Sequence, residues 1–236
     1  MTIGIIIMAA GKSHRFKAES NGVHKLISKV PGSELTVLEM TYQKVCKSYK
    51  PSEIVVVTNQ DEPMVTLLAK TLGCRTLEIK TDGLGTSIAN AMSILMTDPI
   101  NNTDSHDQIE DEKLFKLENF KGIYLLPADL PFILSETLML LKGILEKTTA
   151  TTVRPVFNGI SGHPVGFKQA AFSALCQLTG DEGARSVLTS YRPETISVFD
   201  TGILWDVDTP KDLMVKPHDP AWFSLDAKDL SLKYSL

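Results

Sequence analysis

The chain has 236 residues, of which 43% are hydrophobic and 22% are charged, and its net charge is −4. This length fits one α/β domain, and this composition supports a sizeable core and excludes a chain that is disordered throughout. The negative charge argues against a nucleic-acid-binding surface, so any phosphate site must be a local basic pocket.

The cysteines Cys46, Cys74 and Cys176 lie far apart and show no C-x-x-C spacing, which argues against a disulfide framework and a zinc knuckle. The first apolar run is too short to span a membrane, and no basic segment precedes it as in a signal peptide. We therefore expect a cytoplasmic protein with no membrane association.

The first predicted element is a strand at Ile3–Met8, an apolar and largely β-branched run without polar alternation. Such a run is typical of a strand buried on both faces of a parallel sheet. Small residues and cations follow it, and they suit a phosphate group because backbone N–H groups can approach the anion while the cations supply charge. The residues expected there are Ala9, Ala10, Gly11, Lys12, Ser13, Arg15 and, further along, Lys25.

Two common phosphate-binding patterns fail in this loop. The end of the P-loop pattern G-x-x-x-x-G-K-[ST] fits Gly11–Ser13. The pattern also needs a glycine five positions before Gly11, and that position holds Ile6. The pattern G-x-G-x-x-G fails because Met8 to Arg15 holds one glycine. A solvated turn after a core strand stays open as the alternative.

The next elements alternate between helix and strand: a helix at 34–48, a strand at 54–58, a helix capped by Asp61 and ended by Gly73, and a strand at 76–79. A glycine-rich turn that includes Gly85 then leads into an apolar helix, with Thr86 or Ser87 as its expected N-cap. The acidic segment 97–112 is expected to be an exposed loop.

The strand at 123–126 leads to Asp129, a single carboxylate between two prolines. Open α/β sheets bind ligands outside the carboxyl ends of their strands, and Mg²⁺ takes one or two protein carboxylates together with phosphates and water. We therefore expect Asp129 to hold Mg²⁺. The alternative, a helix cap, is less favoured because the next helix begins well beyond Asp129, near Ser135.

The rest of the chain predicts a helix at 135–147, strands at 149–157 and 196–199, and a turn at 158–166 that leads into a strand. Gly180–Arg185 is expected to open a helix with Asp181 near its start, and Thr209-Pro210 another. A hydrogen-bonded structural role is the alternative for His163, and helix capping is the alternative for Asp208.

Together these motifs resemble the molybdenum cofactor cytidylyltransferases and related nucleotidyltransferases. The segment Met8–Arg15 with Lys25-Leu26 is similar to the family signature L-A-A-G-x-S-x-R…K-L, although the loop before Lys25 is longer here. Further resemblances are Asp129-Leu130-Pro131 to a metal motif, Gly162-His163-Pro164 and Gly180–Arg185 to acceptor motifs, and the segment around Asp208 to D-[IV]-[DN]-T-P-x-D-L.

The resemblance implies an α/β fold, namely a three-layer α/β/α, Rossmann-like, mostly parallel sheet of the nucleotide-diphospho-sugar transferase type. It implies a single nucleotidyltransferase domain at 1–216 and a C-terminal tail at 217–236. It also implies Mg²⁺-dependent transfer of CMP from CTP to a phosphorylated acceptor, with release of pyrophosphate. Molybdopterin is the favoured acceptor, and the resemblance suggests a molybdoenzyme as a partner.

The resemblance also assigns roles to residues of this chain. The catalytic residues are Arg15, Lys25 and Asp129, and the metal ligands are Asp129 and Asp208, with Asp206 in reserve. The nucleotide-binding residues are Ala9, Ala10, Gly11, Lys12, Ser13, Arg15, Lys25, Gly85 and Ser87, and the acceptor-binding residues are Gly162, His163, Pro164, Asp181 and Arg185. Lys12 and Arg15 are expected at the β- and γ-phosphates, and Lys25 at the α-phosphate.

Two alternatives stay open. One is a nucleotidyltransferase of the same fold that uses a sugar or polyol phosphate as acceptor, or GTP as donor. The other is a non-catalytic nucleotide-binding partner of a molybdoenzyme, which the longer loop before Lys25 keeps open. Release of pyrophosphate separates the second alternative from both enzymes.

Overall fold

A computed structural model of the protein describes residues 2–97 and 115–214. Beyond its first residue, the acidic segment expected at 97–112 lies outside these described residues, as does the tail expected at 217–236. The strands are β1 (Thr2–Ala9), β2 (Ile54–Asn59), β3 (Thr76–Ile79), β4 (Phe120–Pro127), β5 (Thr152–Phe157), β6 (Ile160–Ser161), β7 (Val165–Lys168) and β8 (Glu194–Ser197). The strands predicted at 3–8, 54–58, 76–79 and 123–126 are confirmed as β1, β2, β3 and β4.

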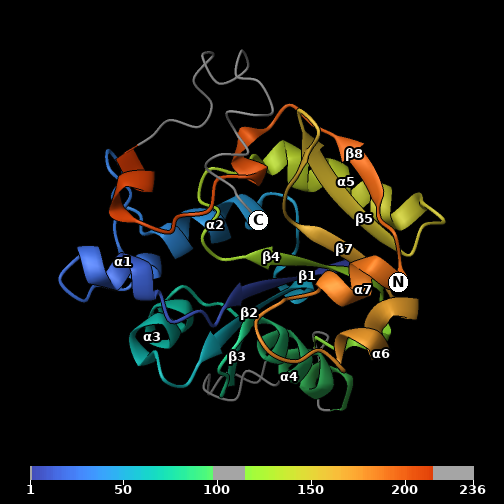
Figure 1. Ribbon diagram of the computed structural model, residues 1–236, viewed down its shortest axis with the longest axis horizontal. Helices are drawn as coiled ribbons and strands as arrows, with labels where there is room; N and C mark the ends of the chain where they lie inside the picture. The colour runs from blue at the N-terminus through green and yellow to red at the C-terminus, as the bar shows by residue number, and fades with distance from the viewer. Residues whose placement is uncertain (1, 98–114, 215–236) are drawn as a thin grey trace.

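The helices cover both faces of the sheet. They are α1 (His14–Glu19), α2 (Val37–Cys46), α3 (Pro63–Thr71), α4 (Leu84–Thr97), α5 (Ser135–Lys147), α6 (Phe172–Leu175) and α7 (Arg185–Ser190). Short 3₁₀ turns lie at Lys25–Ile27, Pro51–Glu53, Leu117–Asn119, Gln169–Ala171, Thr201–Ile203 and Pro210–Met214. In Figure 1, α2 and α5 lie above the central strands β1 and β4, and α4 and α6 lie below them.

The strands form one mixed sheet in the order β3-β2-β1-β4-β7-β5-β6, and β8 pairs with β5. The β3-β2-β1-β4 half is parallel, whereas β7 runs antiparallel to both β4 and β5. The central strand β1 is covered on both faces, which explains its unbroken apolar sequence. The expected three-layer, mostly parallel α/β fold is confirmed.

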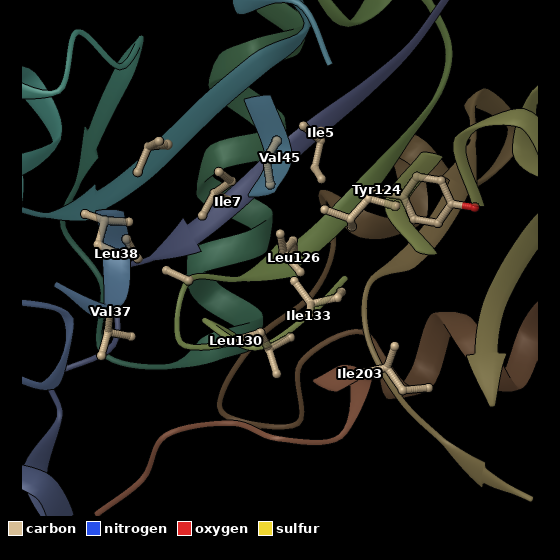
Figure 2. Packing of buried hydrophobic residues seen from close by; sticks show 14 of the residues in the cluster. Ile5, Ile7, Val37, Leu38, Val45, Tyr124, Leu126, Leu130, Ile133 and Ile203 are labelled. Carbon is tan, nitrogen blue, oxygen red and sulfur yellow. The ribbon is translucent and has the colours of Figure 1, made fainter. Parts of the chain in front are cut away.

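Two hydrophobic clusters lie on opposite sides of the sheet because successive strand residues point to opposite faces. Ile5 and Ile7 of β1 belong to the cluster under α2, α3 and α5, whereas Ile6 belongs to the cluster under α4. Figure 2 shows Ile5, Ile7 and Leu126 in the first cluster, beside side chains of α2. These clusters fix β1 and β4 side by side, which sets the positions of the loops that follow them.

Two expected helix caps are wrong. Asp61 does not cap α3, because that helix begins at Pro63, whose fixed φ suits the first helical position, after Glu62. Thr86 and Ser87 do not cap α4, because the backbone N–H of Ser87 already donates to Gly83 O at 2.8 Å, so that the helix begins at Leu84.

The helix expected to open at Gly180–Arg185 begins only at Arg185. Gly180 and Gly183 have φ values of +63° and +56°, which are left-handed and incompatible with a right-handed helix. The strand expected at 196–199 is β8 at Glu194–Ser197, set by its parallel pairing with β5. Gly73 follows α3 with φ +70°, as expected for a residue that ends a helix.

Among the residues that the structure describes, no helix is both long enough and apolar enough to cross a membrane.

A pair of glycine substitutions tests the packing between β4, β7 and α5. A Cβ at Gly166 in β7 would lie 2.7 Å from Tyr124 Cε1 and 3.0 Å from Leu145 Cδ2, whereas a Cβ at Gly143 in α5 meets no atom within 4 Å. The Tyr124 ring cannot yield freely, because its hydroxyl donates to Leu141 O at 2.7 Å. We expect Gly166→Ala to lower the free energy of unfolding by about 1–3 kcal/mol. Gly143→Ala should raise it by about 0.5–1 kcal/mol.

Urea unfolding of both variants beside the wild type measures these changes. A Gly166→Ala protein as stable as the wild type would contradict the packing described for Tyr124.

Candidate active site

A cavity of about 970 Å³ opens at the carboxyl ends of β1 and β4. These strands are parallel neighbours, with Met8 opposite Pro127, so the loops that follow them leave the sheet at the same edge. The backbone N–H of Ala128 donates to Met8 O at 3.0 Å and joins the two loops directly. The phosphate-binding loop expected after β1 and the carboxylate expected after β4 therefore share one cavity.

The loop after β1 turns sharply at Ser13, which has a left-handed φ of 57° immediately before α1. The Ser13 hydroxyl accepts from the backbone N–H of Lys25 at 3.0 Å, and Asn59 Nδ2 donates to Ala10 O at 3.2 Å. These two bonds fix the loop to the start of the 3₁₀ turn at Lys25 and to the end of β2. The longer insertion before Lys25 folds away from the cavity in part as α1.

His24 is a residue of this loop system that the sequence analysis missed. Its Nδ1 accepts from the backbone N–H of Leu26 at 3.1 Å, so Nε2 carries the proton and donates to Gly11 O at 2.9 Å. The side chain is buried, and burial lowers the pKa of His24 below its ordinary 6.5. A neutral histidine thus links the loop after β1 to the segment that carries Lys25.

The charged groups of the site form a continuous cluster around Lys25. Lys25 Nζ lies 2.5 Å from Asp129 Oδ2 and 3.3 Å from Asp208 Oδ1, and Arg15 Nη1 lies 2.8 Å from Asp208 Oδ2. Burial by itself would lower the pKa of Lys25, but the carboxylates of Asp129 and Asp208 raise it above its ordinary value. Lys25 is therefore a fixed positive charge between two acids.

Lys12 and Asp206 lie at the edge of this cluster. Lys12 Nζ lies 3.8 Å from Asp61 Oδ2, so the residue expected to cap α3 instead pairs with a cation of the loop after β1. Burial, followed by repulsion from Asp129 and Asp208, raises the pKa of Asp206 to about 6. Asp206 lines the same cavity.

Asp212 caps the 3₁₀ turn at Pro210–Met214, because its Oδ2 accepts hydrogen bonds from the backbone N–H groups of Asp208 and Thr209. The side chain of Asp208 does not cap this turn and pairs with Lys25 and Arg15 instead.

The acids fit a divalent cation in number and in chemistry. Within the described part of the chain, no three Asp, Glu, His or Cys side chains are grouped closely enough to form a metal site alone. Asp129 and Asp208 are nevertheless brought to one ammonium group, and Asp129 Oδ1 is buried without a hydrogen-bond partner among the described residues. Two carboxylates with a spare oxygen suit Mg²⁺, which completes its shell with phosphates and water.

The start of α4 forms a second wall of the cavity. The Ser87 hydroxyl donates to Gly83 O at 2.7 Å and shares a hydrogen bond with Thr81 Oγ1 at 2.8 Å. Asp181 Oδ1 accepts from the backbone N–H of Leu84 at 3.3 Å, so this expected acceptor residue closes the N-terminus of α4. A Cβ at Gly85 would lie 2.6 Å from Thr179 O, so Gly85 lets two backbones approach each other.

The turn after β6 forms the third wall. A Cβ at Gly162 would lie 2.5 Å from Ile203 O, which explains the glycine, and the backbone N–H of His163 donates to the same oxygen at 2.9 Å. His163 lines the cavity, but its Nδ1 is buried without a partner among the described residues. Burial, with a further effect of Arg154, lowers the pKa of His163 to about 4, so its ring is neutral at pH 7.

The structure brings most of the predicted site residues into this one cavity. Those that line it are Ala10, Gly11, Lys12, Ser13, Arg15, Lys25, Ser87, Asp129, Gly162, His163, Asp181 and Asp208. Those that do not line it are Ala9, Gly85, Pro164 and Arg185. Ala9 is buried in the core at the end of β1, and Arg185 is exposed on α7, so neither reaches the space between the walls.

Comparisons with known proteins identify the family of the chain and solved structures with a similar fold. The MobA-like NTP transferase domain family matches residues 5–195 of the chain. Rv0371c from Mycobacterium tuberculosis superposes with a TM-score of 0.66 at 20% identity, over 91% of this chain and 96% of that one. Its complex with manganese superposes with a TM-score of 0.63 at 18% identity, over the same 91% and 96%.

A cytidylyltransferase from Leptospira borgpetersenii superposes with a TM-score of 0.63 at 15% identity, over 100% of this chain and 94% of that one. No curated protein sequence gives a significant match. Because the family match covers most of the chain, the chain belongs to the MobA-like NTP transferase domain family and is a nucleotidyltransferase.

Proposed function

We propose that the protein transfers CMP from CTP to the phosphate group of a small acceptor in a Mg²⁺-dependent reaction that releases pyrophosphate. The observation that carries the proposal is the position of Lys25 Nζ between Asp129 and Asp208, in one cavity with Arg15 and the loop after β1. Positive side chains and two acids in one cavity suit a triphosphate together with a divalent ion.

The reaction brings two anions together, so charge neutralisation and alignment are what the protein must supply. An oxygen of the acceptor phosphate forms a bond to the α-phosphorus of CTP, and the bond from that phosphorus to the β-phosphate oxygen breaks. Lys12 and Arg15 hold the departing β- and γ-phosphates, and Lys25 holds the α-phosphate. The acceptor phosphate is already ionised, so no strong base is needed.

Asp129 and Asp208 are the residues that would hold Mg²⁺, and a bound Mg²⁺ would neutralise phosphate charge during the transfer. The spare oxygen of Asp129 and the manganese complex of the similar protein Rv0371c support a divalent ion in this role. The pKa of Asp206 is raised by burial and then by repulsion from Asp129 and Asp208, and this proximity to both acids supports Asp206 as a reserve ligand.

Molybdopterin is the acceptor that we favour, because the Gly162-His163-Pro164 turn resembles the acceptor motif of the molybdenum cofactor cytidylyltransferases. Gly162 and His163 of this turn line the same cavity as Asp129. Arg185, from the second acceptor motif, lies outside the cavity, so it would contact only a part of the acceptor that extends beyond the cavity.

Asp129→Asn tests the catalytic assignment. We expect pyrophosphate release to fall about 10²-fold or more, because a carboxylate that would hold the charge-neutralising Mg²⁺ is lost. Glu146→Gln, on the exposed face of α5, is the matched control and should keep wild-type activity. Release is measured with CTP and Mg²⁺, first with molybdopterin and then with sugar phosphates.

Wild-type release with a sugar phosphate but not with molybdopterin would favour the sugar-phosphate alternative. A wild-type protein that binds nucleotide but releases no pyrophosphate with any acceptor would favour the non-catalytic one.

The nucleotide preference is tested by melting temperatures with CTP, GTP, ATP or UTP and Mg²⁺, since a ligand that binds only the folded state stabilises it. We expect CTP to give the largest increase. Ala10 lines the cavity, and its Cβ narrows the space for a base, so Ala10→Gly should increase the response to GTP relative to CTP. Ala18→Gly, at an exposed position of α1, controls for the general effect of a new glycine. Equal responses of Ala10→Gly and the wild type to all four nucleotides would contradict this account of selectivity.

His24 predicts a pH dependence of stability. Its folded-state pKa lies below 6.5, so as the pH falls through 6.5 the unfolded chain takes up a proton that the folded protein resists. The contribution of His24 to the free energy of unfolding should therefore be fully present above pH 6.5. Below pH 6.5 this contribution should decrease, by at most about 1.4 kcal/mol per pH unit. Gly11 O, Glu62, Lys17 and Lys25 are the groups that act on its ring.

The measurement is urea unfolding of the wild type and His24→Gln between pH 5 and 7, with the pH slope as the readout. Asp206 and His163 titrate in both proteins, so the difference in slope reports His24 alone. A His24→Gln protein with the wild-type slope would show that His24 is not the neutral link described above.

A further inference from the structure

Arg154 is a cation in the active-site cavity to which the proposed reaction gives no role. It is the third residue of β5, it is half-buried, and it lines the cavity beside the Gly162-His163 turn. Its Nε donates to Gly162 O at 3.1 Å, which holds the guanidinium against that turn.

Arg154 differs from Lys12, Arg15 and Lys25 in having no acid beside it among the residues that the structure describes. Lys12, Arg15 and Lys25 each lie within 3.8 Å of a carboxylate oxygen. Arg154 forms no ion pair with any residue that the structure describes, and burial alone accounts for the lowering of its pKa. A partly buried charge with no opposite charge beside it is unfavourable in the free protein, so a residue of this kind points to a missing anion.

His163 supplies a second and independent sign of a missing ligand at the same place. Its Nδ1 is buried without a hydrogen-bond partner among the described residues, although its ring lines the cavity. Buried polar atoms are nearly always satisfied in native proteins, and the exceptions concentrate where a ligand or water binds. His163 is within electrostatic reach of both Arg154 and Asp129, so this place borders the metal-binding acids.

We propose that Arg154, with the ring of His163 beside it, binds the phosphate monoester of the acceptor substrate and holds it next to Asp129 for attack. This inference depends on the proposed function and adds to it the group that recognises the acceptor. A guanidinium suits a phosphate because its planar fork can donate two parallel hydrogen bonds to one anion. The triphosphate has its own cations in Lys12, Arg15 and Lys25, so Arg154 is left for the second anion.

A binding role and a structural role for Arg154 predict opposite effects on stability. If Arg154 serves a ligand, Arg154→Gln removes an unpaired half-buried charge, and the melting temperature of the free protein should stay the same or rise. If Arg154 only holds the Gly162 turn, the melting temperature should fall. Arg192→Gln, at an exposed arginine after α7, is the control for loss of a positive charge.

The probe of the site is inorganic phosphate, titrated by calorimetry into protein saturated with Mg²⁺ and a CTP analogue whose α–β bridge cannot be cleaved. The analogue occupies the triphosphate positions, so phosphate binding reports the acceptor end of the cavity. We expect Arg154→Gln to bind phosphate at least about tenfold more weakly than the wild type, as for loss of a charge-assisted bond. Arg154→Lys should be intermediate, because it keeps the charge but loses the fork. Arg192→Gln should bind phosphate as the wild type does.

The outcomes separate this inference from the proposed function. Failure of every protein to bind the CTP analogue would overturn the proposed function itself. Binding of the analogue together with equal phosphate affinity in Arg154→Gln and the wild type, or with no phosphate binding by the wild type, would overturn the role of Arg154 and leave the nucleotide site intact. If Arg154→Gln melts below the wild type, the phosphate affinity of Arg154→Lys decides whether Arg154 binds the acceptor phosphate. An affinity of Arg154→Lys equal to that of the wild type would overturn this role.

Discussion

The active site depends on one ammonium group that holds together two distant acids. Lys25 Nζ contacts Asp129 after β4 and Asp208 near the end of the described chain, although these residues are far apart in sequence. The contact is possible because β1 and β4 are parallel neighbours whose following loops meet at one edge of the sheet. Removal of the Lys25 charge would leave the largely buried Asp129 carboxylate without its cation, which is far less favourable than the intact cluster. The sheet therefore places the charges, and the charges in turn hold the last segment of the described chain against the sheet.

Pairing with acids also explains how a chain of net charge −4 keeps several cations in one cavity. Lys12 faces Asp61, and Arg15 faces Asp208, so the cations do not repel one another in the free protein. The side chains of Lys12 and Arg15 are partly exposed, so solvent weakens their ion pairs with Asp61 and Asp208. Phosphate oxygens could therefore replace these carboxylates with little loss of free energy. A cavity of this kind is stable without its ligand and yet electrostatically suited to it.

The sequence predicted the features that depend on local residues. The apolar run of β1, the loop after it and Asp129 after β4 follow from neighbouring residue types and from the general place of ligands in α/β sheets. His24 and Arg154 were missed because their roles depend on Gly11 and Gly162, partners that the fold brings near. The same reason applies to Asp181, whose side chain accepts a hydrogen bond from the backbone N–H of Leu84 in α4 and not from its own helix. It also applies to Gly85, which is needed because its backbone lies close to Thr179 O. Contacts between distant segments have no local signal in a single sequence.

The unsatisfied groups of the cavity divide it into two unlike ends. At the end formed by the loop after β1, Lys12, Arg15 and Lys25 each have an acid beside them, and His24 fixes the backbone, so this end is organised without a ligand. Toward the β5 side, Asp129 Oδ1 and His163 Nδ1 are buried without partners among the described residues, and Arg154 has no acid. Unpaired polar groups reduce the stability of the free protein, so their concentration around one space is hard to explain by folding alone. A second, anionic substrate would give Arg154 the opposite charge that it lacks, and a divalent ion would give Asp129 Oδ1 the partner that it lacks. Together these two ligands would satisfy the groups that the free cavity leaves without partners.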